Sequence, residues 1–172
     1  MAEALAKISQ VQDWGMIQIR ADLARAGEAI AAAAGVALPG QGRITTDGSR
    51  SLGWMSPDEL LLVLPCAEAA EALAALQDAL ATEHALVLDV SDMRAVFRIQ
   101  GARALDVLAK LCPADLAAMP EDGLRRTRAA QVACGIWREP GGYVLIGFRS
   151  VTDYLRGILT GAAAPGTQLS PR

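Results

Sequence analysis

The sequence predicts an α+β protein made of two β-α-β-β-α halves, whose mixed sheets are covered by helices. Three observations predict this class. Apolar residues make up 52% of a chain of 172 residues, which is enough for a compact domain with a buried core. Stretches in which apolar residues alternate with polar ones are interspersed with stretches at helical spacing. The same order of elements then occurs a second time along the chain.

The elements of the first half follow from local patterns. Ile17 and Ile19 alternate with polar residues, which predicts a strand, and the next segment has Ala26 and Ile30 at helical spacing. Pro57 suits the second position of a tight turn between two strands. The predicted elements are strand Met16–Arg20, helix Asp22–Ala34, a short strand Arg43–Thr46, strands Leu52–Met55 and Leu60–Leu64, and helix Ala67–Ala81.

The second half repeats this order. Pro113 ends a helix whose apolar face includes Leu105 and Leu108, and Ser150 is placed to cap a final helix. The predicted elements are strands Leu86–Val90 and Ala95–Gln100, helix Ala102–Leu111, a loop over Pro113–Arg126, strands Ala129–Trp137 and Tyr143–Phe148, and a helix from Ser150.

A repeated motif supports a duplication. Trp54-x-x-Pro57-x-x-Leu60-Leu61-Leu62 aligns with Trp137-x-x-Pro140-x-x-Tyr143-Val144-Leu145, with Trp, Pro and Leu identical, although such hairpins can also recur by chance. We therefore expect one compact domain over residues 16–160, with pseudo-repeats at about 16–82 and 86–160. Residues 1–15 are predicted to be an N-terminal extension, and residues 161–172 a disordered tail.

Charge and composition exclude several classes of partner. The net charge is −3 and no run of Lys or Arg occurs, which argues against nucleic acid and anionic membrane surfaces. No apolar stretch is long enough to span a membrane, and none near the start resembles a signal peptide. We expect a cytoplasmic protein. Cys66, Cys112 and Cys134 are widely spaced among apolar residues, which predicts free thiols in the core and no metal site.

Motifs for catalysis are weak. His84 is the only histidine and lies between a predicted helix and strand, where a solvated loop residue is the simpler interpretation. Neither a complete G-x-G-x-x-G nor a P-loop sequence is present. The segment Asp89-Val90-Ser91-Asp92 is typical of a local turn. Arg125, Arg126 and Arg128 form the densest positive cluster, which could contact a partner. We predict no catalytic, cofactor-binding or metal-binding residue.

A wider set of motifs resembles the gamma subunit family of heterotetrameric sarcosine oxidases. The resemblance spans about residues 54–159. The motifs are Asp89-Val90-Ser91-Asp92, Arg94 to Gly101, Ala104-x-x-Val107-Leu108, Cys112-Pro113-x-Asp115-Leu116, Arg126-Thr127 and Arg149-Ser150-x-x-x-Tyr154-Leu155. That family in turn resembles the duplicated folate-binding domain of the glycine-cleavage T-protein (aminomethyltransferase).

The resemblance implies a subunit of a complex that oxidises sarcosine to glycine, transfers the one-carbon unit to tetrahydrofolate and forms hydrogen peroxide. The partners would be the alpha, beta and delta subunits, which would hold FAD, FMN, NAD, tetrahydrofolate and zinc, with none on this chain. The aminomethyltransferase-type site resembles a segment with asparagines, and this chain contains no asparagine. The resemblance therefore implies the fold without the folate site, and a role in stabilising the large subunits.

Aromatic and arginine side chains are the usual anchors of permanent interfaces. We predict Trp14, Trp54, Trp137 and Arg149 as interface candidates. Two other functions stay open. The chain could be a free-standing folate- or anion-binding protein of the same fold that uses the cluster Arg125–Arg128, or it could be a homodimeric structural module.

Overall fold

The computed structural model describes residues 3–169. They divide into two compact units. The first unit consists of residues 13–92, and the second combines residues 3–12 with residues 93–169. Residues 1–2 of the predicted extension and residues 170–172 of the predicted tail lie outside the described residues. The single domain expected over residues 16–160 is thus divided into two units, each with its own core.

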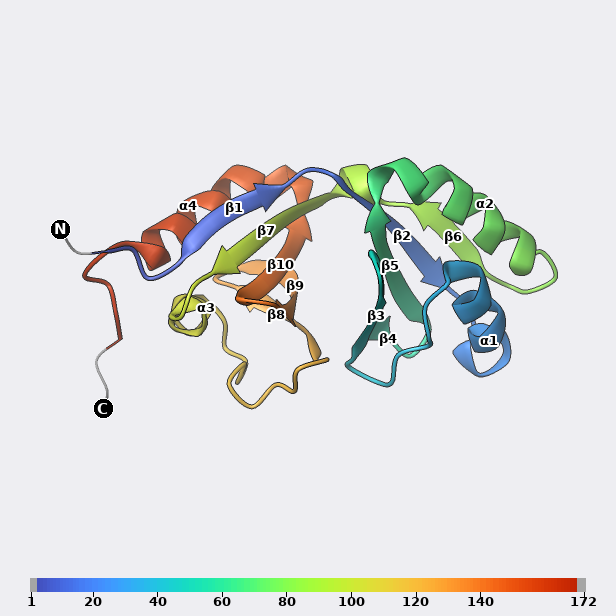
Figure 1. Cartoon of the computed structure of the whole chain (residues 1–172), viewed down its shortest axis with the longest axis horizontal. Helices are drawn as coiled ribbons and strands as arrows, with labels where there is room; N and C mark the ends of the chain where they lie inside the picture. Colours follow the sequence, from blue (N-terminus) through green and yellow to red (C-terminus); the bar gives the residue numbers. More distant parts are fainter. Residues whose placement is uncertain (1–2, 170–172) are drawn as a thin grey trace. The chain divides into compact units, whose positions relative to one another are not determined.

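The first unit contains five strands and two helices. In chain order they are β2 (Trp14–Arg20), α1 (Leu23–Ala34), β3 (Ile44–Asp47), β4 (Arg50–Ser56), β5 (Glu59–Pro65), α2 (Ala69–Ala79) and β6 (Leu86–Asp89). The strands form one sheet in the order β3-β4-β5-β2-β6. Both helices lie on one side of this sheet (Figure 1). The helices and the sheet face beneath them enclose the core of the unit.

Local chemistry explains why α1 forms where the sequence predicts it. Asp22 is the N-cap, and its side chain accepts a hydrogen bond from the Ala24 amide at 3.0 Å. Gly35 ends the helix at φ 70°, a left-handed conformation that suits glycine. The buried face of α1 carries Ile30 against the sheet. Its other buried side chains are small, so most of the apolar contact in this core comes from the strands and α2.

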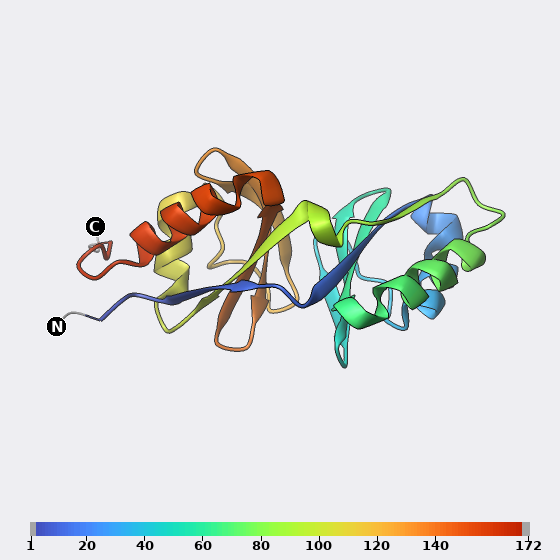
Figure 2. The ribbon, with the colours of Figure 1, turned by 90° about the horizontal axis from the view of Figure 1, so that it is seen from above.

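The second unit contains the same number of strands and helices. They are β1 (Lys7–Val11), β7 (Arg94–Gln100), α3 (Ala104–Leu111), β8 (Leu124–Ala129), β9 (Val132–Glu139), β10 (Gly142–Phe148) and α4 (Thr152–Ala163). The sheet order is β1-β7-β10-β9-β8. Helix α4 runs alongside β1 in both ribbon views (Figures 1 and 2). Phe97, Leu145 and Leu155 are fully buried in its core.

The two sheets repeat one topology. Each repeat has the order β-α-β-β-β-α, with three strands between its helices where the predicted β-α-β-β-α half has two. In the first repeat the additional strand is β3, which matches the short strand predicted at Arg43–Thr46, and in the second it is β8. Trp54 lies in β4 and Trp137 in β9. Each of these strands is next to an edge strand of its sheet, β3 in the first unit and β8 in the second. The shared order of elements and strands supports the duplication.

All strand pairs of the described sheets are antiparallel, so the mixed sheets predicted from the sequence are wrong. The difference has a simple physical reason. In each repeat the last three strands follow one another through short connections, which join antiparallel neighbours. The strand before the first helix then pairs antiparallel with the last of these three strands.

Two strands were not predicted. Strand β1 lies in the predicted N-terminal extension, and its five residues pair with β7. Strand β8 begins in the predicted loop Pro113–Arg126, and a turn at Ala130, with φ 51°, separates it from β9. The predicted strand Ala129–Trp137 therefore contains the end of one strand, a turn and most of the next. At the other end, α4 continues to Ala163, inside the predicted tail.

Two further expectations are wrong in detail. Cys66 is exposed in the 3-10 turn Cys66–Glu68, whereas Cys112 and Cys134 are buried as predicted. Ser150 does not cap the last helix, because a 3-10 turn over Arg149–Val151 precedes α4. None of the helices that the structure describes has the length and hydropathy needed to cross a bilayer.

Replacement of Gly142 by alanine should destabilise the second unit. A Cβ atom there would lie 2.0 Å from the carbonyl oxygen of Ile99, so the paired strands would have to shift. We expect Gly142→Ala to lower the free energy of unfolding by about 1–3 kcal/mol in denaturant titrations. The control is Gly157→Ala in α4, where a Cβ meets nothing within 4 Å and a gain of up to about 1 kcal/mol is expected. Equal effects of the two changes would contradict this packing.

The three thiols should differ in their rate of labelling. In the native chain a bulky aromatic disulfide reagent should react rapidly with exposed Cys66 and slowly with Cys112 and Cys134. All three should react rapidly in denaturant. Rapid native labelling of two or more thiols, measured by absorbance and located by mass spectrometry, would show that the core assignment is wrong.

Candidate functional site

The four predicted interface residues differ in exposure. Trp14 is half-buried at the start of β2, and Trp54 is half-buried against the core of the first unit. Trp137 is only 5% exposed in β9, so its indole is mainly part of the folded interior. Arg149 is exposed in the turn that precedes α4. A contact with a partner stays a prediction for each of them, and exposure favours Arg149 most.

The structure adds an aromatic side chain next to Arg149. Phe148 is 43% exposed, and the guanidinium carbon of Arg94 lies 4.8 Å from the centroid of its ring. Phe148 and Arg94 are opposite each other in the pairing of β10 with β7, and Met93, which precedes Arg94, is 51% exposed. Phe, Met and Arg are enriched in interfaces. We call Met93, Arg94, Phe148 and Arg149 the Phe148 patch.

The first unit also exposes apolar side chains, on the edge strand β6. Leu86 and Leu88 are 46% and 45% exposed, while Val87 between them is buried in the core. The sequence predicts a strand over Leu86–Val90, but an apolar run does not reveal that the strand will form an edge of the sheet. Since a strand alternates its side chains between two faces, the single core contact at Val87 leaves both leucines on the other face.

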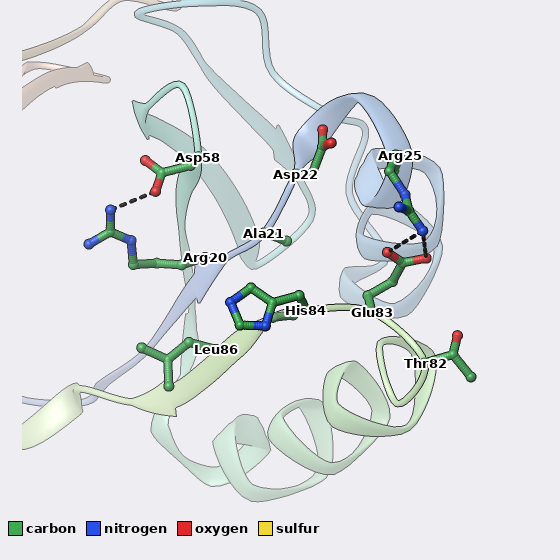
Figure 3. Close-up of a pocket in the computed structure, with 10 residues that line it drawn as sticks. Arg20, Ala21, Asp22, Arg25, Asp58, Thr82, Glu83, His84 and Leu86 are labelled. Carbon is green, nitrogen blue, oxygen red and sulfur yellow. Dashed lines mark hydrogen bonds and ion pairs between the residues drawn. The ribbon is translucent and has the colours of Figure 1, made fainter.

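A surface pocket of about 950 Å³ lies in the first unit, beside the start of α1 and the loop before β6. Figure 3 shows the ion pairs Arg20–Asp58, at 2.6 Å, and Arg25–Glu83, at 3.2 Å, with His84 between them. The hydrogen bond from Arg20 lowers the pKa of Asp58, and the same bond raises the pKa of Arg20. The charges that line the pocket thus largely satisfy one another.

His84 is exposed in the loop between α2 and β6, as the sequence predicts. The residues that line the pocket include neither serine nor cysteine. The hydroxyl of Thr82 lies on the far side of the loop from the imidazole (Figure 3). The pocket therefore lacks the pairing of a nucleophile with a base that nucleophilic catalysis by histidine requires.

The other polar motifs have local structural roles. Asp89 accepts hydrogen bonds from the amide of Ser91 at 2.9 Å and from its hydroxyl at 2.5 Å, and Ser91 Oγ accepts from the Met16 amide. This is the turn that the sequence predicts.

The arginine cluster Arg125–Arg128 lies on β8, and its side chains fall on both faces of the sheet. Because side chains alternate along β8, Arg126 and Arg128 point to one face of the sheet and Arg125 to the other. The three guanidinium groups therefore do not converge on one anion. Among residues 3–169 no group of three His, Cys, Asp or Glu side chains could hold a metal ion.

Comparison with known sequences identifies the family. The model of the "Sarcosine oxidase, gamma subunit family" matches residues 20–165. Sarcosine oxidase subunit gamma of Corynebacterium sp. (strain U-96) is 41% identical over 115 residues, which cover 64% of this chain and 55% of that protein. The protein of the same name from Arthrobacter sp is 36% identical over 137 residues, with 75% and 66% covered. The matches thus span about half to two thirds of these relatives.

Comparison with solved structures agrees with the family found from the sequence. A chain of the heterotetrameric sarcosine oxidase from Corynebacterium sp. U-96, in complex with pyrrole 2-carboxylate, has a TM-score of 0.87 and 30% identity, and the match covers 97% of this chain and 88% of that one. The glycine cleavage system aminomethyltransferase T of Bartonella henselae shares the fold, with a TM-score of 0.70 and 17% identity over 93% of this chain and 46% of that one. This chain belongs to the sarcosine oxidase gamma subunit family.

Proposed function

We propose that this chain is the gamma subunit of a heterotetrameric sarcosine oxidase and assembles with alpha, beta and delta subunits. The main support is its likeness to a chain of the Corynebacterium complex, with a TM-score of 0.87 over 97% of this chain. The complex would oxidise sarcosine to glycine, transfer the one-carbon unit to tetrahydrofolate and produce hydrogen peroxide. FAD, FMN, NAD, tetrahydrofolate and zinc would be held by the other subunits.

The role proposed for this chain is to stabilise the cofactor-bearing large subunits without taking part in catalysis. The paired charges of the surface pocket and the exposed position of His84 support this role. The local turn formed by Asp89 and Ser91 supports it as well. The ion-paired side chains of the pocket and the Asp89–Ser91 turn thus serve the fold, and His84 faces solvent.

The Phe148 patch is the surface that we propose for contact with a large subunit. It combines the exposed ring of Phe148 and the exposed side chains of Met93 and Arg149. These residues lie where the end of β10 pairs with the start of β7. Such residues can fill pockets of a partner and exclude water from the contact. Arg94 already lies over the ring, which limits the freedom of Phe148 before binding and thereby reduces the entropy lost on association.

Omission of this chain should destabilise the complex. A protein that binds only the folded form of its partner stabilises it by RT ln(1 + [L]/Kd), about 2.7 kcal/mol at one hundred times Kd. We expect the alpha, beta and delta subunits expressed without this chain to melt at a lower temperature and to lose flavin absorbance on heating sooner. The purified chain should restore both properties. An unchanged melting curve would contradict the stabilising role.

Calorimetric titration of the purified chain separates the proposed function from its alternatives. We expect no heat of binding with tetrahydrofolate or with FAD. Micromolar binding of folate would instead favour the free-standing folate-binding protein. A stable homodimer on gel filtration, combined with failure to co-purify with a flavin-coloured complex, would favour the structural module.

Removal of an anchor should weaken assembly without affecting the fold. We expect Arg149→Ala to weaken association with the large subunits by about 30-fold, as is typical of an anchor that contributes about 2 kcal/mol. The melting temperature of the free chain should change little, since Arg149 is exposed.

Arg128→Ala is the matched control, because it removes the same charge from an exposed position of β8. Association can be measured by surface plasmon resonance at physiological salt. Equal losses for the two variants would indicate general attraction between charges and would contradict a specific anchor at Arg149.

A further inference from the structure

Strand β6 is an edge strand of the first unit, and its outer side pairs with no strand among residues 3–169. On its inner side β6 pairs antiparallel with β2, and the Val90 amide continues this pairing with a hydrogen bond to the Met16 carbonyl at 2.8 Å. Residues of an antiparallel strand direct their N–H and C=O groups alternately toward the partner strand and away from it. Counted back from Val90, the backbone groups of Val87 and Asp89 therefore point to the free side of β6.

The side chains of β6 do not protect this edge. Leu86 and Leu88 are 46% and 45% exposed on the face opposite the core. The other three edge strands carry charged side chains at exposed positions, which are Lys7 in β1, Asp47 in β3 and three arginines in β8. Such charges discourage pairing with another chain. The only charged residue of β6 is Asp89, whose carboxylate is held in the turn that follows the strand.

A side chain of α2 already approaches the free side of β6. The Nε2 group of Gln77 donates a hydrogen bond to the Val87 carbonyl at 3.4 Å. This bond is long for an N–H···O hydrogen bond, and Gln77 is exposed, so its amide can rotate away at low cost. The contact agrees with the outward direction of the Val87 carbonyl. It also shows that an amide N–H can reach this carbonyl from outside the sheet, as the backbone of an added strand would.

We infer that β6 accepts an extended segment of a partner protein as a sixth strand of this sheet. The backbone of the segment pairs with Val87 and Asp89, and two apolar side chains, separated by one residue, cover Leu86 and Leu88. A helix could cover the leucines, but its own hydrogen bonds occupy its backbone groups. The two covering positions carry no charge, because a charge there would lose its hydration beside the leucines.

The number of residues that β6 offers favours a partner protein over a second copy of this chain. Two copies paired through β6 would contribute four strand residues each, whereas a stable specific interface contains about 20–30 residues on each side. A segment that extends from a larger partner is free of this limit, because the rest of the contact lies elsewhere. The inference does not rest on the proposed function, since it concerns the edge of the first unit and not the Phe148 patch.

A model strand tests the inference on the full chain. The probe is the fluorescein-labelled peptide Lys-Thr-Val-Thr-Val-Thr-Lys with blocked ends, and fluorescence anisotropy measures its binding. We expect binding that weakens by at least about tenfold when the three threonines carry backbone N-methyl groups, which keep the charge but prevent strand pairing. Leu88→Lys should weaken binding by about tenfold. Leu38→Lys is the matched control without effect, since Leu38 is 41% exposed in the same unit but outside β6. Gln77→Ala should strengthen binding by about twofold, because no amide has to leave the Val87 carbonyl.

Amide hydrogen exchange, followed by NMR in the unmodified chain, locates the added strand. Saturating peptide should slow exchange of the Val87 and Asp89 amides by at least about tenfold. The Leu88 amide faces β2 and should be protected with or without peptide. Binding without new protection at Val87, equal binding of the N-methylated peptide, or no binding at millimolar peptide would each overturn the inference. A dimer of the free chain that Leu88→Lys abolishes would assign the edge to a second copy and would also overturn it.

Discussion

Pairing between β1 and β7 is the constraint on which the arrangement of the chain depends. Lys7–Val11 form a five-residue ladder with Val96–Gln100, and the Leu5 amide bonds to the Ala163 carbonyl. The second unit is therefore built from two segments of the sequence, one before and one after residues 13–92. The first unit is thus inserted in the sequence between β1, an edge strand of the second unit, and the other strands of that unit. Strand β6 has the equivalent place beside β2. Each repeat thus depends on a strand that lies outside it.

Two separate cores use most of the apolar side chains, and few polar side chains are left that could form a catalytic or binding site. Central strands such as β5 are almost completely buried, and the helices cover their sheets with Ala, Leu and Ile. The polar residues satisfy local needs, as in the turn at Asp89 and the ion pair at Arg20. The role that we propose for the chain therefore depends on the exposed aromatic and arginine side chains of the Phe148 patch and not on the pocket.

Local patterns explain how much of the fold could be predicted. Helix α1 has a cap at Asp22 and a regular apolar face, and the loop position of His84 follows from the elements around it. Strand β1 was missed because its partner lies about 90 residues away, and no local signal reveals such pairing. Strand β8 was missed because most of its side chains are charged or polar and exposed. The Phe148 patch forms because the end of β10 pairs with the start of β7, and the sequence pattern does not reveal which strands pair.

The inserted position of the first unit has a consequence for synthesis. Residues 13–92 leave the ribosome as one continuous segment that contains every strand of their sheet, so this unit can fold while translation continues. Strand β1 is made before all of them, yet its partner β7 is made only afterwards. During that interval the N-terminal strand is an unsatisfied edge, and its short, largely polar sequence, Lys-Ile-Ser-Gln-Val, limits the risk of aggregation in the nascent chain.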